Sequence, residues 1–327
     1  MAAYHLRMPE IRTTSVVFAS PHSGRDYSWN FVRRSILDEK VLRSSEDAFV
    51  DQLFSAAPLH GAPLLAATAP RAWIDVNRAE DELDPALIEG VKKIAHNPRV
   101  SSGLGVVPRV VANGRAIYRG KLSLKEASAR VADIWTPWHD ALQTLMDDSV
   151  SLFGEAVLVD CHSMPHEAIE SISRTKAARP EIVLGDRFGA AASAEVVDRI
   201  EAAFTSAGLR VARNAPFAGA FVAQQRAGRD FRVIAIDVTS EGSPLPHHVF
   251  LLADRHARHV FFDDERADAL VPFLWIGHCK DTVPIGHTTT ADPPLDAVDD
   301  VLVALLDGGH LQAGGVGANF GLGQRIG

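Results

Sequence analysis

Three short polar clusters in this sequence come directly after apolar runs, where an open parallel sheet places its reactive groups. The clusters are PHSG at residues 21–24, DVNR at residues 75–78 and DCHSMP at residues 160–165. Two histidines at separate strand ends, joined by one carboxylate, would form a three-ligand site with an open fourth position, as hydrolytic zinc requires. The sequence therefore predicts metal ligation by His22 and His162.

The third ligand is expected from SEDAF at residues 45–49, which opens a predicted helix. A carboxylate in the first turn of a helix can face inward. Glu46, Asp47 and Asp51 are all candidates, and Asp47 is the preferred one. The alternative interpretation is that these acids only stabilise the start of the helix, which is the commoner role.

A hydrolytic site also needs a carboxylate that moves protons and a cation that holds an acidic substrate. Asp237, at the end of a predicted strand over residues 232–238, is the candidate base. Arg78, with Arg109 as a second candidate, offers a guanidinium group that pairs bidentately with a carboxylate. In the alternative interpretation, Asp237 caps a turn and Arg78 forms a surface ion pair with neighbouring acids.

Apolar runs that alternate with helical periods predict an α/β fold with a mainly parallel, buried sheet. The predicted strands are residues 15–20, 63–67, 73–76, 156–160, 182–185, 210–213 and 232–238. The predicted helices are residues 47–57, 124–153 and 191–206, and Pro137 should kink or divide the longest one. Since neighbouring strand residues point to opposite faces, Cys161 is not expected to act as a nucleophile beside His162.

Size and composition exclude several classes of protein. The chain has 327 residues, of which 46% are hydrophobic, and a net charge of -8 without a long basic run, which argues against binding nucleic acid. No signal-peptide pattern and no membrane-spanning apolar stretch is evident, and two cysteines form no disulfide framework. We therefore expect a cytoplasmic protein with a small-molecule substrate and no membrane partner. The oligomeric state is not defined by the sequence.

The composition changes after Ser240. Residues 241–327 contain seven of the 14 histidines and end in a Gly-rich stretch, and residues 265–275 and 295–306 are candidate amphipathic helices. We expect a catalytic domain of residues 1–240 and a divergent C-terminal segment of residues 241–327, partly helical with a flexible Gly-rich end.

Seven short strings recur in an order and separation that resemble a known family. They are SPHSG at 20–24, SEDAFVD at 45–51, PRAWIDVNR at 70–78, GLGVVPR at 103–109, DCHSMP at 160–165, LGDRFG at 184–189 and NAPFAG at 214–219. From about residue 9 to residue 237 the sequence resembles the N-formylglutamate amidohydrolase family. At residue 237 the family usually has Glu, and after Ser240 the chain departs from the family pattern.

The resemblance implies a phosphorylase/hydrolase-like α/β fold similar to zinc carboxypeptidases, with a mostly parallel or mixed central sheet between helices. It implies hydrolysis of N-formyl-L-glutamate to formate and glutamate, as in histidine breakdown. The implied metal ligands are His22, Asp47 and His162, the substrate carboxylate would be held by Asn77 and Arg78, and Asp237 would be the general base. Zinc is the favoured ion, with manganese or iron as alternatives.

The leading hypothesis is thus a metal-dependent amidohydrolase that removes a formyl or small acyl group from an acidic amino acid. Two alternatives stay open. The same site would also suit another N-acyl amino acid or a small peptide, because family membership does not define the side-chain pocket. The chain would otherwise be a catalytically inactive homologue, as the change at Asp237 and the divergence after Ser240 suggest.

Overall fold

The computed structural model of the chain describes residues 2–92, 97–165, 167–170, 179–219, 221–226 and 231–240. The predicted C-terminal segment of residues 241–327, with its two candidate helices, lies outside the described residues. The division at residue 240 therefore stays a prediction.

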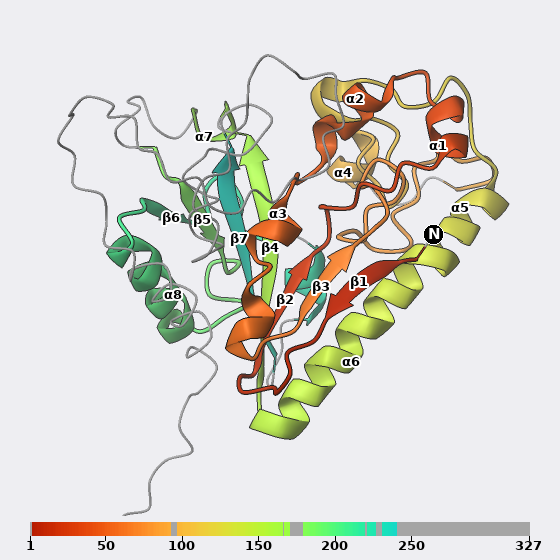
Figure 1. Cartoon of the computed structure of the whole chain (residues 1–327). Coiled ribbons are helices and arrows are strands. Elements are labelled where there is room, and N and C mark those ends of the chain that lie inside the picture. The colour runs from red at the N-terminus through yellow and green to blue at the C-terminus, as the bar shows by residue number, and fades with distance from the viewer. Residues whose placement is uncertain are drawn as a thin grey trace, which may run out of the picture.

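A seven-stranded mixed sheet forms the centre of the fold, in the order β1-β3-β2-β4-β7-β5-β6 (Figure 1). The strands are β1 (Tyr4–Arg7), β2 (Val16–Ser20), β3 (Leu64–Ala67), β4 (Ala156–Pro165), β5 (Ile182–Gly185), β6 (Val211–Arg213) and β7 (Phe231–Ser240). Strands β3, β2, β4 and β7 are parallel, whereas β1 and the β5–β6 pair run antiparallel to them. The predicted α/β class is confirmed, with a mixed sheet.

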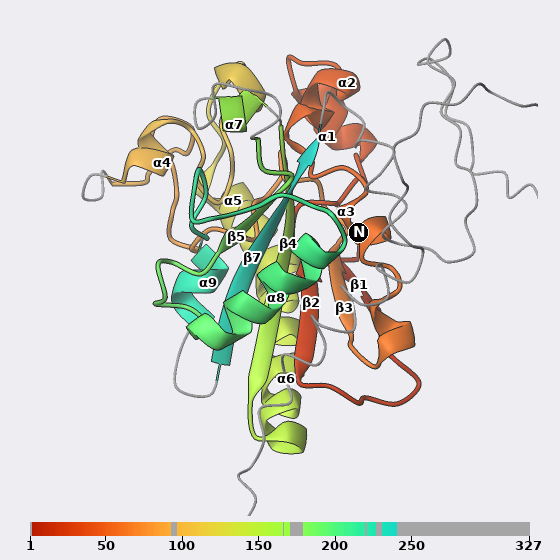
Figure 2. The same ribbon diagram turned by 90° about the vertical axis from the view of Figure 1, so that its left-hand side faces the viewer.

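Helices cover both faces of the sheet (Figures 1 and 2). One face packs against α5 (Leu124–Arg130) and α6 (Thr136–Phe153), and the other against α3 (Val50–Leu53) and α8 (Ala194–Ser206). Along β2, Val17 and Ala19 face the α6 side and Val16 and Phe18 face the α8 side, as strand geometry requires. The other helices are α1 (Trp29–Arg34), α2 (Glu39–Leu42), α4 (Pro98–Ser101), α7 (Glu167–Glu170) and α9 (Phe221–Arg226).

The strand predicted at residues 73–76 is wrong. The backbone N–H groups of Trp73 and Ile74 both donate to the carbonyl of Pro70, at 2.8 and 3.2 Å, so the chain turns there. Ile74 and Val76 are nevertheless buried. The apolar run reflects a loop inside the core, which cannot be distinguished from a buried strand by its composition.

The helix predicted at residues 47–57 is much shorter in the structure, where α3 is Val50–Leu53 and a 3-10 turn follows at Ala57–His60. Phe49 has a φ of 64°, a left-handed conformation that an α-helix of L-residues does not contain. Asp47 therefore lies in the loop before α3, and the prediction that it occupies the first helical turn is wrong.

The long helix predicted at residues 124–153 is divided, as expected. A π turn, Val131–Trp135, separates α5 from α6, and the N–H of Thr136 donates to the carbonyl of Val131 five residues earlier. Pro137 lies in the first turn of α6, where it has no N–H to donate.

Two further observations complete the fold. The short strand β1 was not predicted, because it has only four residues, three of which are exposed at the sheet edge. Within the part of the chain that the structure describes, no helix has the length and apolar character to cross a membrane.

Candidate functional site

The loop after β2 carries His22, and close packing fixes its path. A side chain at Gly24 would bring its Cβ to 2.1 Å from the carbonyl oxygen of Ala69, so only glycine fits. The backbone N–H of Asp47 donates to the carbonyl of His22 at 3.0 Å. This hydrogen bond ties the loop before α3 to the loop after β2.

Strands β4 and β7 carry three further side chains of the site, those of Asp160, His162 and Asp237. Asp160 and His162 are two residues apart on β4, so they share one face of the sheet. His162 pairs with Asp237 of β7. Both residues lie within their strands, whereas the sequence predicted His162 beyond its strand; β4 and β7 are longer than expected because they pair with each other up to Pro165 and Ser240.

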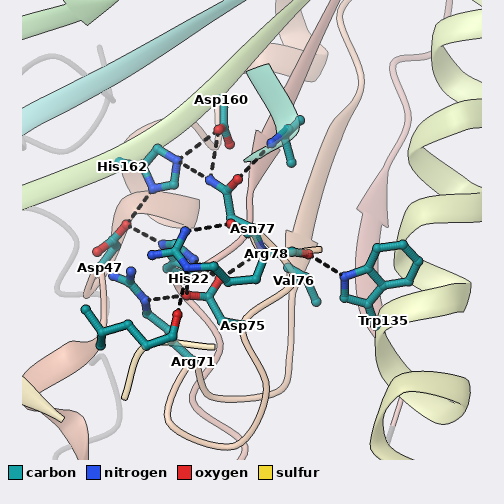
Figure 3. Close-up of polar contacts among 12 residues, drawn as sticks. His22, Asp47, Arg71, Asp75, Val76, Asn77, Arg78, Trp135, Asp160 and His162 are labelled. Carbon is teal, nitrogen blue, oxygen red and sulfur yellow. Dashed lines mark hydrogen bonds and ion pairs between the residues drawn. The ribbon is translucent and has the colours of Figure 1, made fainter. Parts of the chain in front are cut away.

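His22, Asp47 and His162 come together in a buried cluster (Figure 3). The Oδ2 atom of Asp47 lies 3.3 Å from Nδ1 of His22 and 2.9 Å from Nδ1 of His162. One potential ligand atom from each of the three residues lies within 4.8 Å of the others. The residues are only 3%, 5% and 8% exposed, in chain order. Their geometry and chemistry therefore fit a divalent metal ion.

A second carboxylate lies behind each histidine. Nε2 of His22 is 2.8 Å from Oδ1 of Asp75, and Nε2 of His162 is 3.0 Å from Oδ2 of Asp160. A carboxylate on Nε2 favours a proton there and leaves Nδ1 as the lone-pair donor, which is how proteins orient histidine ligands. Both histidines thus present the same nitrogen to Asp47.

The charges of these groups shift several pKa values. Burial alone would raise the pKa of Asp47, but hydrogen bonds from His162 and His22 outweigh it and lower the pKa. Burial would lower the pKa of His162, yet Asp160 and then Asp47 raise it well above its usual value. The pKa of Asp237 is raised to about 6, chiefly by burial; the charge of His162 opposes the rise, and the charges of Asp47 and Asp160 add to it.

The two other candidate acids point to partners of their own. Asp51 forms a bidentate ion pair with Arg25, with both N–O distances at 3.0 Å. Glu46 lies 3.4 Å from Nε of Arg43. Of the three carboxylates considered from the sequence, Asp47 is the one that the structure brings to the histidines.

Asn77 is fully buried beneath the cluster. Its Nδ2 lies 3.1 Å from both Oδ2 of Asp160 and Nε2 of His162, and its Oδ1 accepts the backbone N–H of Val222 at 3.0 Å. These bonds link β4 to α9. A substrate-binding role for Asn77 stays a prediction, and in this structure its amide is engaged by protein groups.

Arg78 and Arg109 differ in their surroundings. Arg78 is buried, and its guanidinium donates to the carbonyls of Leu104 and Asn77 at 3.0 and 2.8 Å. Arg109 is about one-third exposed and pairs with the buried Asp84 at 2.8 Å. The substrate-binding role predicted for both arginines stays a prediction.

Arg71 was given no role from the sequence, although it lies in the PRAWIDVNR string. Its Nε donates to Oδ2 of Asp75 at 3.0 Å, and Figure 3 shows its guanidinium beside the histidine cluster. Burial lowers its pKa, but the charges of Asp75, Asp47 and Asp237 raise it overall. The signal for Arg71 in the sequence was its position four residues before Asp75 of the DVNR cluster.

Cys161 is not part of the cluster. It points to the opposite face of β4, among the apolar residues on the α8 side. Burial raises the pKa of its thiol well above the ordinary value. The expectation that it does not act as a nucleophile beside His162 agrees with this orientation.

The fold and the cluster define a class: a mixed α/β protein with a buried two-histidine, one-carboxylate group at the edge where its parallel strands end. The sequence model of N-formylglutamate amidohydrolases matches residues 14–241. The chain therefore belongs to the N-formylglutamate amidohydrolase family.

Named relatives agree with this membership. A crystal structure of N-formylglutamate amidohydrolase from Ralstonia eutropha JMP134 has 33% sequence identity and a TM-score of 0.67, covering 73% of this chain and 86% of that one. An Agrobacterium tumefaciens protein with 16% identity and a TM-score of 0.54, covering 73% of this chain and 84% of that one, shares the fold.

Two curated relatives are named N-formylglutamate deformylase. The protein from Pseudomonas aeruginosa is 25% identical over 195 residues, which is 59% of this chain and 66% of the relative. The protein from Pseudomonas putida is 28% identical over 151 residues, which is 46% of this chain and 51% of the relative. The matches thus span less than two-thirds of each relative.

Proposed function

We propose that this protein is a metal-dependent amidohydrolase that hydrolyses N-formyl-L-glutamate, or a similar small N-acyl acidic amino acid, to formate or another acid and the free amino acid. The observation that carries the proposal is the buried convergence of His22, Asp47 and His162, with a carboxylate behind each histidine. Zinc is the proposed ion, because two imidazoles and one carboxylate are a ligand set of hydrolytic zinc sites. The names of the relatives support the substrate.

When bound by these three residues, zinc would polarise the scissile carbonyl and lower the pKa of a water molecule. Asp237, beside His162 in the sheet, is the proposed base. Its carboxylate would accept a proton from the attacking water and deliver it to the nitrogen of the leaving amine. In the metal-free site, burial is the main cause that raises the pKa of Asp237 to about 6.

Guanidinium groups would hold the negative charges of the substrate. Arg78 is the proposed partner of a substrate carboxylate, and Arg71, beside the cluster, is a second cation for a carboxylate or for the charge that develops on the carbonyl oxygen. Arg109 and Asn77 remain candidates whose side chains would have to exchange some present bonds for the substrate.

Four finer predictions accompany this function. The arrangement of sheet and ligands is proposed to be of the zinc-carboxypeptidase type. Residues 1–240 are proposed to form the catalytic domain, with residues 241–327 as a divergent segment. A cytoplasmic location and a part in histidine breakdown are proposed from the sequence.

The test is formate release from N-formyl-L-glutamate by the purified full chain, measured as isolated, after chelation and after zinc is returned. Release that disappears on chelation and returns with zinc would support the proposal. His162→Ala is the matched control, and it should release no formate under any of these conditions. A folded, zinc-loaded protein that releases no formate would overturn the substrate, and other N-acyl amino acids would then be assayed.

A further inference from the structure

The loop that carries Asp75, Asn77 and Arg78 has no regular secondary structure, yet it is buried beneath the site. Buried carbonyl groups must find hydrogen-bond donors, and in a loop neither a helix nor a sheet supplies them. The carbonyls of Trp73, Val76 and Arg78 therefore need donors from another part of the chain.

One helical segment supplies all three donors from side chains. The bonds are Arg130 Nη1 to Trp73 O at 3.1 Å, His139 Nε2 to Val76 O at 2.8 Å and Trp135 Nε1 to Arg78 O at 2.9 Å. All three donor residues are buried, and Figure 3 shows the indole of Trp135 directed at the loop. The guanidinium of Arg130 also lies 3.3 Å from the ring centroid of Trp73.

The π turn explains why these three side chains face the same way. Arg130 and Trp135 are five residues apart, which in a regular α-helix would separate them by about 140° around the axis. The wider π turn, Val131–Trp135, brings residues five apart onto one side. His139 follows Trp135 by one α-helical turn, with their ring centroids 3.8 Å apart. The turn thus aligns the donors with the loop.

The bonded carbonyls alternate with the side chains that reach the histidines. Asp75 contacts His22 directly, and Asn77 donates to Asp160, whose carboxylate accepts from His162, whereas the carbonyls of Val76 and Arg78 point to the helix. A loop that moved away from the helix would take both polar contacts with it. The three side-chain donors would therefore keep both histidines in orientation without contacting them, by holding the loop in place.

We propose that Arg130, Trp135 and His139 are positioning residues of the site, which hold the Asp75–Arg78 loop by its backbone and through it the metal-binding nitrogens. That these nitrogens bind metal rests on the proposed function. The fixing of the loop itself does not depend on it.

Two tryptophans of this helical segment provide a matched test. Trp135→Phe removes an indole N–H that donates to Arg78, while its ring remains to pack on His139. Trp138→Phe makes the same change at a fully buried residue whose indole nitrogen has no hydrogen-bond partner in the described part of the chain. Both tryptophans pack on His139, with ring centroids 3.8 Å from it for Trp135 and 4.8 Å for Trp138, but only the first variant loses a bond to the loop.

The first measurement is amide exchange of residues 75–78 in metal-free protein, and the second is zinc affinity by competition with a chelator. For Trp135→Phe we expect exchange in the loop to be about tenfold faster, and zinc to bind about 10- to 100-fold more weakly, as when groups behind a ligand are removed. Trp138→Phe should change neither beyond its effect on global stability. Equal behaviour of the two variants would overturn the proposal.

A second pair covers the case in which Trp135→Phe does not fold. His139→Gln keeps an N–H that can reach the carbonyl of Val76, and His139→Leu does not. Loop exchange close to wild type in the Gln variant and faster in the Leu variant supports the proposal, and equal exchange in both contradicts it. Because exchange is read without metal, it stays informative even if the chain neither binds zinc nor releases formate.

Discussion

Replacing Asp160 by Asn removes a negative charge behind His162 with almost no change of shape. Oδ2 of Asp160 accepts from Nε2 of His162 at 3.0 Å and from Nδ2 of Asn77 at 3.1 Å. Its Oδ1 makes no hydrogen bond within the described residues. The carbonyl oxygen of an asparagine can take the place of Oδ2, so both hydrogen bonds can persist. The effect of the substitution is therefore mainly electrostatic.

The magnitude follows from what Asp160 does to His162. Among the groups that raise the pKa of His162 against the effect of burial, Asp160 is the largest. Without that charge the imidazole becomes a weaker base and a weaker ligand. Loss of a carboxylate behind a ligating histidine typically costs 10- to 100-fold in metal affinity, or about 1.4–2.7 kcal/mol.

The pH dependence of zinc binding should change as well. Zinc must displace a proton from His162, so its affinity for the wild-type protein should keep rising with pH until the raised pKa of His162 is passed. In Asp160→Asn that pKa is lower, so the rise should end at a lower pH. The difference in zinc affinity between the two proteins should therefore be clearest at high pH, where His162 is deprotonated in both of them.

Competition with a chelator at several pH values measures the zinc affinity, and NMR titration of the metal-free protein measures the pKa of His162. Asp186→Asn is the matched control, because Asp186 is also buried but bonds to Asn214 instead of a cluster histidine. The reasoning would be refuted if Asp160→Asn bound zinc as wild type does at every pH and left the titration of His162 unchanged.

Three further predictions concern His162 and Asp237. His162→Ala should lose zinc, and one equivalent of zinc retained after dialysis would disprove the proposed ligands. Asp237→Glu, which restores the usual family residue, should increase formate release if the shorter acid limits the rate; activity that falls in a folded variant would contradict this. In the metal-free protein the pKa of Asp237 is about 6 in the folded state, against a reference value of 3.8. Because the folded state binds the proton more tightly, the contribution of Asp237 to stability is present below pH 4 and is lost as pH rises through 6. The free energy of unfolding should fall by at most about 3 kcal/mol over this range, and Asp237→Asn should remove most of this pH dependence. Denaturant unfolding of both proteins at pH 4 and pH 8 measures it.

The sheet and the positions of its polar ends could be predicted from the sequence. The strands β2, β4 and β7 begin with or contain runs of Val, Ile, Leu, Phe and Ala that are buried on both faces, which gives a clear signal. Since parallel strands end at one edge, His22 and His162 were expected at the same edge despite their separation in sequence, and the structure shows that β2 and β4 are neighbours there.

The support of the site could not be predicted in the same way. Asp75 contacts His22 from a loop that resembles a strand in composition, and the loop takes its shape from donors more than fifty residues further along the chain. Trp135 and His139 lie in a predicted helix, and helical periodicity predicts no polar role for them. The role of their ring N–H groups becomes evident only when the structure shows which buried backbone carbonyls they bond.

The charge balance of the site also depends on the fold. Glu46 and Asp51 lie on either side of Asp47 in the sequence, and each is directed to an arginine of its own. The buried carboxylates that remain at the site are Asp47, Asp75, Asp160 and Asp237, against the guanidinium groups of Arg71 and Arg78. This excess of acid raises the pKa of His162 and adds to the larger effect of burial on the pKa of Asp237, and a divalent cation would offset it. A metal ion at this position is therefore favoured by the electrostatics of the whole site as well as by its three ligands.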